Sequence, residues 1–189
     1  MSTTRTANTA LILIDIQNDY FPGGKNELTG SLEAGRQAGC LLAYFRRARL
    51  LPVFIQHLAI RLGATFFLPG TPGADIHSSV QPLPGETIIQ KHYPNSFRET
   101  GLLDCLRQVQ ITRLVISGMM THMCVEATTR AAFDLGFECL VAADACATKD
   151  LLFEGKIIPA DTVHRSFLAG LQGTYGKVMR VDELIASIV

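Results

Sequence analysis

Six short apolar segments, separated by segments of helical pattern, constrain the fold of this 189-residue chain most strongly. The first, ALILID at 10–15, is a continuous apolar run ending in a carboxylate, typical of a strand covered on both faces of a parallel sheet. Further strands are expected at 52–57, 87–91, 113–118, 137–144 and 177–181, and helices at 38–48, 99–110, 121–135, 159–173 and 182–189. This alternation predicts an α/β protein of three layers, α/β/α, with a doubly wound, six-stranded and mainly parallel sheet.

Length and charge limit the possible partners. A chain of 189 residues fits one domain, 1–189, and the 17 Lys and Arg balance the 17 Asp and Glu, so no broad field favours nucleic acid or a membrane surface. The apolar run near the N-terminus is too short for a signal peptide or a membrane span. The five cysteines include no C-x-x-C pair and are expected to be reduced. We expect a cytoplasmic protein that acts on a small molecule.

Three reactive residues lie at or just after the ends of expected strands. Asp15 closes the first strand, Lys91 closes the third, and Cys124 follows the fourth by a few residues. The carboxyl ends of parallel strands share one edge of the sheet, where ligands bind near the switch point in strand order. The topology therefore predicts that these three residues meet in space, although they are distant in the sequence.

Cys124 is the candidate nucleophile. A free thiol has a pKa near 8.5 and is mostly protonated at neutral pH. If Thr121 caps the following helix, Cys124 lies in its first turn, where the helix dipole and Lys91 would lower the thiol pKa and Asp15 could accept the proton. The alternative is that Cys124 is a packed core thiol, which is the more common role of a cysteine among apolar residues.

Three sequence stretches resemble the isochorismatase-like cysteine hydrolase family of the nicotinamidase/isochorismatase superfamily. They are LILIDIQNDYF at 11–21, IQKHYPNSF at 89–97 and GMMTHMCVEATTRAAFDLGF at 118–137. The resemblance implies a catalytic Asp15, Lys91 and Cys124. It also implies a cis peptide between Met119 and Met120, with the backbone N–H groups of Met120 and Cys124 forming an oxyanion hole.

The resemblance to amide-hydrolysing members implies a thioester mechanism. Asp15 would take the thiol proton, Cys124 would attack a small carboxamide or related C–N bond, and water would hydrolyse the thioester. Isochorismatases proper cleave a vinyl ether without needing the cysteine, so the presence of Cys124 favours the amide chemistry. No cofactor is expected.

The sequence departs from the nicotinamide-hydrolysing relatives, which hold a metal with an Asp-x-His and a further His. The corresponding region here has His57 without that motif. A metal site built from His57, His77 and His92 is conceivable, but their spacing matches no zinc pattern, so we expect no metal. His57 is interpreted as a hydrogen-bonding partner of the substrate, with simple packing as the alternative.

Four aromatic residues near the candidate catalytic residues are expected to line the pocket. They are Tyr20, Phe21, Tyr93 and Phe97. Each could instead belong to the core, which is the more usual place for an aromatic residue beside a strand end.

Three other functions remain open at this stage. They are vinyl-ether hydrolysis, a redox-sensing thiol protein in which Cys146 resolves an oxidised Cys124, and a non-catalytic binding protein on the same fold. Family likeness also implies a homo-oligomer, with the contact expected in the long Gly- and Pro-rich segment at 58–86.

Overall fold

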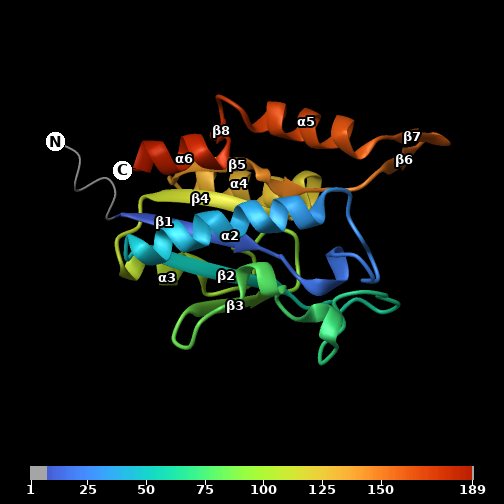
Figure 1. The fold of residues 1–189 in the computed structure, drawn as a ribbon, viewed down its shortest axis with the longest axis horizontal. Helices are drawn as coiled ribbons and strands as arrows, with labels where there is room; N and C mark the ends of the chain where they lie inside the picture. The colour runs from blue at the N-terminus through green and yellow to red at the C-terminus, as the bar shows by residue number, and fades with distance from the viewer. Residues whose placement is uncertain (1–7, 189) are drawn as a thin grey trace.

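A computed structural model describes residues 8–188 and contains the predicted six-stranded sheet (Figure 1). The strand order is β3-β2-β1-β4-β5-β8, and each neighbouring pair is parallel. The strands are β1 Thr9–Ile14, β2 Leu51–His57, β3 Thr87–Lys91, β4 Arg113–Met119, β5 Glu138–Ala147 and β8 Lys177–Met179. The order runs outward from β1 in one direction and from β4 in the other, so the switch point lies between these two central strands.

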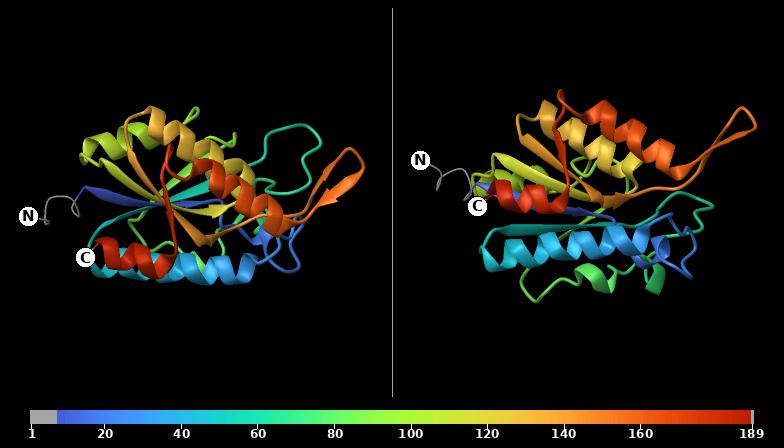
Figure 2. Two further views of the ribbon diagram at one scale, coloured as in Figure 1. Left: turned by 90° about the horizontal axis from the view of Figure 1, so that it is seen from above. Right: turned by 45° about the horizontal axis from the view of Figure 1, so that its top comes forward.

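Helices cover both faces of the sheet, which confirms the three-layer α/β/α prediction (Figure 2). Helices α2 and α6 lie on one face, and α3, α4 and α5 lie on the other. Their bounds are α2 Ser31–Arg47, α3 Leu102–Gln108, α4 Glu126–Asp134, α5 Ala160–Leu171 and α6 Val181–Ile188. Helix α2 begins seven residues before the expected 38, and the last residue of the expected helix 182–189 lies outside the described residues.

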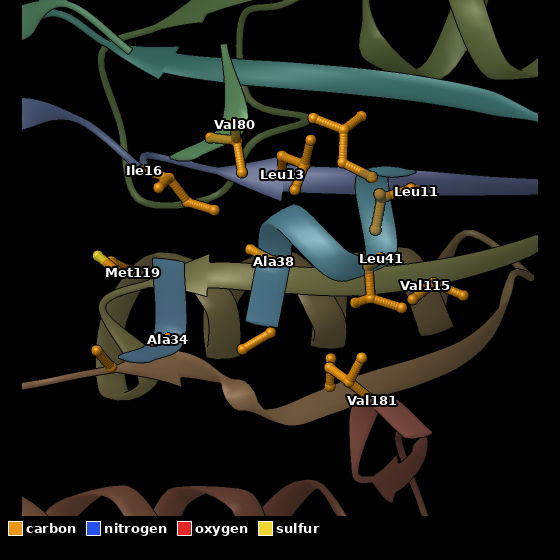
Figure 3. Packing of buried hydrophobic residues seen from close by; sticks show 14 of the residues in the cluster. Leu11, Leu13, Ile16, Ala34, Ala38, Leu41, Val80, Val115, Met119 and Val181 are labelled. Carbon is orange, nitrogen blue, oxygen red and sulfur yellow. The ribbon is translucent and has the colours of Figure 1, made fainter. Parts of the chain in front are cut away.

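The period of two along β1 divides the core between the two faces. Leu11 and Leu13 pack with residues of α2, including Leu41, as Figure 3 shows. Ile12 and Ile14 point to the opposite face and pack with residues of α3 and α5. Burying a side chain of this size contributes roughly 1.5 to 3 kcal/mol. A strand buried on both faces explains why its sequence is a continuous apolar run rather than an alternating one.

A hairpin after β5 was not predicted. Its strands, β6 Leu151–Phe153 and β7 Lys156–Ile158, pair antiparallel and project from the body of the protein (Figure 2). Leu152, Phe153 and Ile157 are each more than three-fifths exposed. Strands of three residues without a buried face leave no periodic signal in the sequence.

The remaining connections are short helical turns or irregular loops. The turns are Asn18–Tyr20, Pro72–Ala74 and Ser78–Val80, and the last two lie within the long 58–86 segment. Within residues 8–188, no helix is both long enough and apolar enough to cross a bilayer.

Gly118 allows β4 to pack closely beside β1 near the end of both strands, and we predict that it tolerates no side chain. Its φ is +130°, and a Cβ atom there would lie 2.0 Å from the Ile14 carbonyl oxygen. Replacement by alanine should lower the free energy of unfolding by at least about 2 kcal/mol, because strain and a backbone clash combine. Urea denaturation measures this difference.

Gly136 provides the matched control, because its φ is +91° but a Cβ atom there would meet no atom within 4 Å. Gly136→Ala therefore isolates the conformational cost, of about 1 kcal/mol. Equal losses for the two variants would show that close packing against Ile14 is unimportant.

Candidate active site

Asp15, Lys91 and Cys124 meet at the carboxyl edge of the sheet, as the topology predicted. Asp15 directly follows β1, Lys91 is the last residue of β3, and Cys124 lies in the π-helical turn Thr121–Val125 after β4. Lys91 Nζ is 2.8 Å from Asp15 Oδ2. Cys124 Sγ lies within 4.8 Å of an Asp15 carboxylate oxygen and of a ring nitrogen of His57. All three predicted catalytic side chains are at most 2% exposed.

The backbone turns sharply at Asp15 to place its carboxylate. Asp15 has a φ of 51°, in the left-handed region that aspartate tolerates better than most residues, and its N–H donates to the Ile55 carbonyl at 3.0 Å. Within residues 8–188, neither carboxylate oxygen of Asp15 has a hydrogen-bond partner of regular geometry. The carboxylate is therefore held by the charge of Lys91 while it retains free capacity to accept a proton.

Lys91 is oriented from the other side. Its ammonium donates to the Pro94 carbonyl oxygen at 2.9 Å, in the turn that follows β3. Burial lowers the pKa of Lys91. The neighbouring Asp15 and Cys124 raise it by more than burial lowers it, so the pKa of Lys91 lies above its usual value. Lys91 is thus a permanent cation in the floor of the site.

The protonation state of Cys124 differs from the prediction. Burial, followed by the negative charge of Asp15, raises the pKa of the Cys124 thiol far above its usual range, and the opposing effect of Lys91 is smaller. Burial also raises the pKa of Asp15, but Lys91 and His57 outweigh it and leave that pKa below its usual value. The expected lowering of the thiol pKa is therefore wrong. At neutral pH the site holds a thiol beside a carboxylate.

The turn that carries Cys124 also differs from the predicted α-helix start. Met120, not Thr121, occupies the N-cap position, and the Val125 N–H donates to the Met120 carbonyl at 3.2 Å across the wide π turn. The Thr121 hydroxyl donates to the Ala147 carbonyl oxygen and pairs with His164 Nδ1 at 2.9 Å. The peptide between Met119 and Met120 is cis, as the family resemblance implied.

A cavity of about 690 Å³ opens above Cys124. Of the predicted site residues, Tyr20, His57, Tyr93, Met120 and Cys124 line it, while Asp15 and Lys91 lie beneath this lining. It is also lined by Ala59, Ile60, Arg61, Ala64, Phe66, Phe67, His92, His122, Met123, Lys149 and Leu151. A hollow of similar volume, about 700 Å³, lies beside the edge strand β3, but no thiol lines it. The Cys124 thiol beside Asp15 and Lys91, not the volume, identifies the candidate site.

Phe21 and Phe97 do not line this cavity, contrary to the prediction. Phe21 is buried and stacks on His77 with ring centroids 3.5 Å apart. Phe97 stacks on Phe137, with centroids 6.0 Å apart, and packs against the opposite face of the sheet. Both belong to the core, the alternative that proximity in sequence could not exclude.

Sequence analysis missed two polar residues that shape the site. Gln17 is fully buried, and its carboxamide donates to the carbonyls of His57 and Ala74 and accepts from the His57 N–H at 2.7 Å. The Asp19 carboxylate accepts from the N–H groups of Lys25 and Phe67. Both residues lie in the DIQND stretch, but polar residues after a strand are indistinguishable from an ordinary loop without their partners in space.

Gln17 fixes the backbone of His57, whose ring lies beside the Asp15 carboxylate. His57 Nδ1 is 3.8 Å from Asp15 Oδ2, which is longer than a hydrogen bond. His57 thus faces the cavity from the end of β2, between the strands that carry Asp15 and Lys91.

The described residues do not assemble the conceivable metal site. His77 stacks on Phe21 and lines a separate hollow of about 420 Å³, while the His92 ring pairs with the Leu58 carbonyl oxygen at 2.8 Å. Asp15, His57 and Cys124 are spaced closely enough to surround an ion. However, the Lys91 ammonium already neutralises the one carboxylate of that trio and would repel a cation.

Comparison with known proteins gives a consistent result. The isochorismatase domain model matches residues 9–183. This chain belongs to the isochorismatase family. The isochorismatase family protein YddQ of Bacillus subtilis is 48% identical over 178 residues, covering 94% of this chain and 98% of YddQ. A crystal structure described as an isochorismatase hydrolase from Oleispira antarctica superposes with a TM-score of 0.92 at 50% identity, covering 98% of this chain and 99% of that one.

A more distantly similar protein carries a named activity. The streptothricin hydrolase of Streptomyces noursei is 34% identical over 142 residues, covering 75% of this chain and 50% of that protein. The chain is accordingly an isochorismatase-family hydrolase with the expected six-stranded fold.

The charge of Asp15 should control the reactivity of Cys124. In Asp15→Asn the carboxylate that raises the thiol pKa is lost while Lys91 remains, so the thiol pKa should fall. We predict that Cys124 in this variant reacts with iodoacetamide at pH 7 about tenfold or more faster than in the wild type. Peptide mass spectrometry resolves Cys124 from the other cysteines.

Asp134→Asn is the control, because it removes the same charge from an exposed position at the end of α4. Its Cys124 should react as slowly as that of the wild type. Rapid alkylation of wild-type Cys124 at pH 7 would contradict the raised thiol pKa.

Proposed function

We propose that the chain hydrolyses a small carboxamide through a thioester on Cys124. The observation that carries the proposal is the thiol of Cys124 within 4.8 Å of the Asp15 carboxylate, itself paired with Lys91, at the floor of a cavity. A carboxylate with free accepting capacity beside a protonated thiol is the arrangement that general-base activation of a nucleophile requires.

In the first step, the thiol proton moves to Asp15 as the sulfur attacks the carboxamide carbon. The S–C bond forms and the carbonyl electron pair moves to oxygen. The N–H groups of Met120 and Cys124 are the proposed donors to this oxyanion, each worth about 2.7 to 4 kcal/mol. Because the resting thiol is neutral, proton transfer and attack are coupled, and no free thiolate accumulates.

In the second step, the C–N bond breaks and the proton held by Asp15 passes to the departing nitrogen. A water molecule then gives a proton to Asp15, and the oxygen of that water attacks the thioester carbon. The C–S bond breaks, the sulfur recovers the proton, and a carboxylic acid is released. Lys91 stabilises the negative charge that remains on Asp15 or on the sulfur at each stage.

The named relatives support amide chemistry. One is the streptothricin hydrolase, and another is nicotinamidase 3 of Arabidopsis thaliana, which is 24% identical over 185 residues, covering 95% of this chain and 88% of that protein. Vinyl-ether hydrolysis, suggested by the family name, is the second candidate. The two reactions differ in their need for Cys124. Vinyl-ether hydrolysis should continue in Cys124→Ala but should be lost when Asp15 is replaced.

The redox alternative has weaker support. Burial raises the pKa of Cys146 to about 12, and the pKa of Cys124 is raised as well, whereas a redox-sensing cysteine needs thiolate character. Cys146 lines a separate hollow of about 280 Å³, not the cavity above Cys124. A Cys124–Cys146 disulfide formed under peroxide would restore this alternative.

The pH dependence of hydrolysis tests the assignment of the base. Asp15 must be ionised to act, and its pKa lies below the ordinary value, so kcat/KM should stay flat down to about pH 4 and fall only below it. The raised pKa of Cys124 predicts no increase between pH 8 and 9, where an isolated thiol would ionise. A rise of kcat/KM with a midpoint near pH 8.5 would indicate a free thiolate nucleophile instead.

The covalent intermediate is the direct test. Brief mixing of wild-type protein with a panel of small amides, followed by intact mass spectrometry, should reveal an acyl adduct on Cys124. Cys124→Ala should form no adduct and lose at least about 10³-fold in kcat/KM, and Asp15→Asn about 10²- to 10⁴-fold. Cys40→Ser, which removes an exposed thiol, should behave as wild type. Unchanged amide hydrolysis in Cys124→Ala would refute the proposal.

A further inference from the structure

The cavity above Cys124 carries positive charge without acidic residues to balance it. Among residues 8–188, no aspartate or glutamate lines it, whereas Arg61 and Lys149 do. Asp15 lies below the cavity lining, and its charge is neutralised by Lys91 at 2.8 Å. The two cations belong to different segments, Arg61 to the loop after β2 and Lys149 to the segment between β5 and the hairpin.

Lys149 is positioned without being neutralised. Its ammonium donates to the side-chain oxygen of Asn26 at 2.8 Å, a neutral partner that fixes the direction of the side chain and leaves its charge uncancelled. Over residues 8–188, neither Lys149 nor Arg61 has an acidic group within 4.0 Å. Arg46 and Arg113, outside the cavity, instead pair with Glu86 and Glu138.

The residues around Lys149 also leave its positive charge uncancelled. His122 lines the cavity, and burial together with the charge of Lys149 lowers its pKa, so its imidazole is neutral at pH 7. One ring nitrogen pairs with the Thr148 hydroxyl. Most of the remaining lining is apolar, including Phe66, Phe67 and Met120. An uncompensated cation in a concave and largely apolar site attracts anions more strongly than the same cation on open surface.

We propose that the substrate carries a carboxylate in addition to its carboxamide, and that Lys149 binds this carboxylate with Arg61 as a second cation. The carboxamide then faces Cys124 at the cavity floor. This inference rests on the proposed amidohydrolase function and narrows its substrate to small monoamides of dicarboxylic acids. Charge-assisted hydrogen bonds in such a site favour the anionic compound over a neutral one of equal shape.

The test compares ligands of matched shape and different charge. Succinamate and 4-methylpentanamide have the same branched outline, with two oxygens of the first replaced by two methyl groups in the second. Calorimetry on Cys124→Ala at low ionic strength measures binding without turnover. We expect succinamate, or its homologue glutaramate against the matching neutral amide, to bind about tenfold or more tightly, and high salt to reduce the difference.

Variants locate the responsible cation. In the Cys124→Ala background, Lys149→Gln should reduce the preference for the anionic ligand about tenfold, and Arg61→Gln should reduce it less. Lys156→Gln removes the same charge from an exposed hairpin position outside the cavity and should leave the preference unchanged. When Cys124 is intact, the ratio of kcat/KM for succinamate to kcat/KM for 4-methylpentanamide should fall most in Lys149→Gln, less in Arg61→Gln and not at all in Lys156→Gln.

The two proposals can fail separately. If neutral and anionic amides acylate Cys124 equally well and bind equally well, the amidohydrolase function stands and the carboxylate preference is overturned. If the anionic ligands bind through Lys149 but no amide is hydrolysed, the anion site stands and the proposed reaction fails. A failure of both anionic ligands to bind Cys124→Ala also overturns the inference.

Discussion

The buried ion pair between Asp15 and Lys91 is the interaction on which the site depends. Two charges that are fully removed from water are tolerated only when they face each other closely, and removing one partner of such a pair typically costs about 3 to 5 kcal/mol. The pair joins the ends of β1 and β3 across the end of β2. It also keeps Asp15 ionised, and burial together with this negative charge keeps the proton on Cys124. This one contact thus fixes the positions of Asp15 and Lys91 and influences which groups of the site carry a proton.

Much of the fold and the meeting of the three candidate catalytic residues could be predicted, because both follow from periodicity and topology. Strands that are buried on both faces have continuous apolar sequences, such as 10–15. Helices between successive strands indicate a parallel sheet. Once the strands are parallel, residues at their carboxyl ends share an edge. The convergence of Asp15, Lys91 and Cys124 is therefore a consequence of chain order, although Asp15 and Cys124 are more than a hundred residues apart in the sequence.

The properties that could not be predicted depend on distances between segments that have no common period. The direction of the Cys124 pKa shift is set by burial and by a carboxylate more than a hundred residues away in the sequence, not by the helix start beside it. Phe21 and Phe97 flank catalytic residues in sequence but point into the core. Lys149, Phe66 and Phe67 come from loops, whose packing partners are not encoded in local pattern.

Gln17 anchors both ends of the chain stretch that forms one side of the cavity, beside the floor that holds Asp15 and Lys91. Its single carboxamide bonds to the end of β2, at His57, and to Ala74 in the middle of the segment that connects β2 to β3. The residues between these two anchors, including Arg61, Phe66 and Phe67, form one side of the cavity. Insertions or exchanges within this stretch can therefore remodel which molecules fit without displacing the reacting groups. A fold built this way can acquire new substrates by changing one loop while it retains one chemistry.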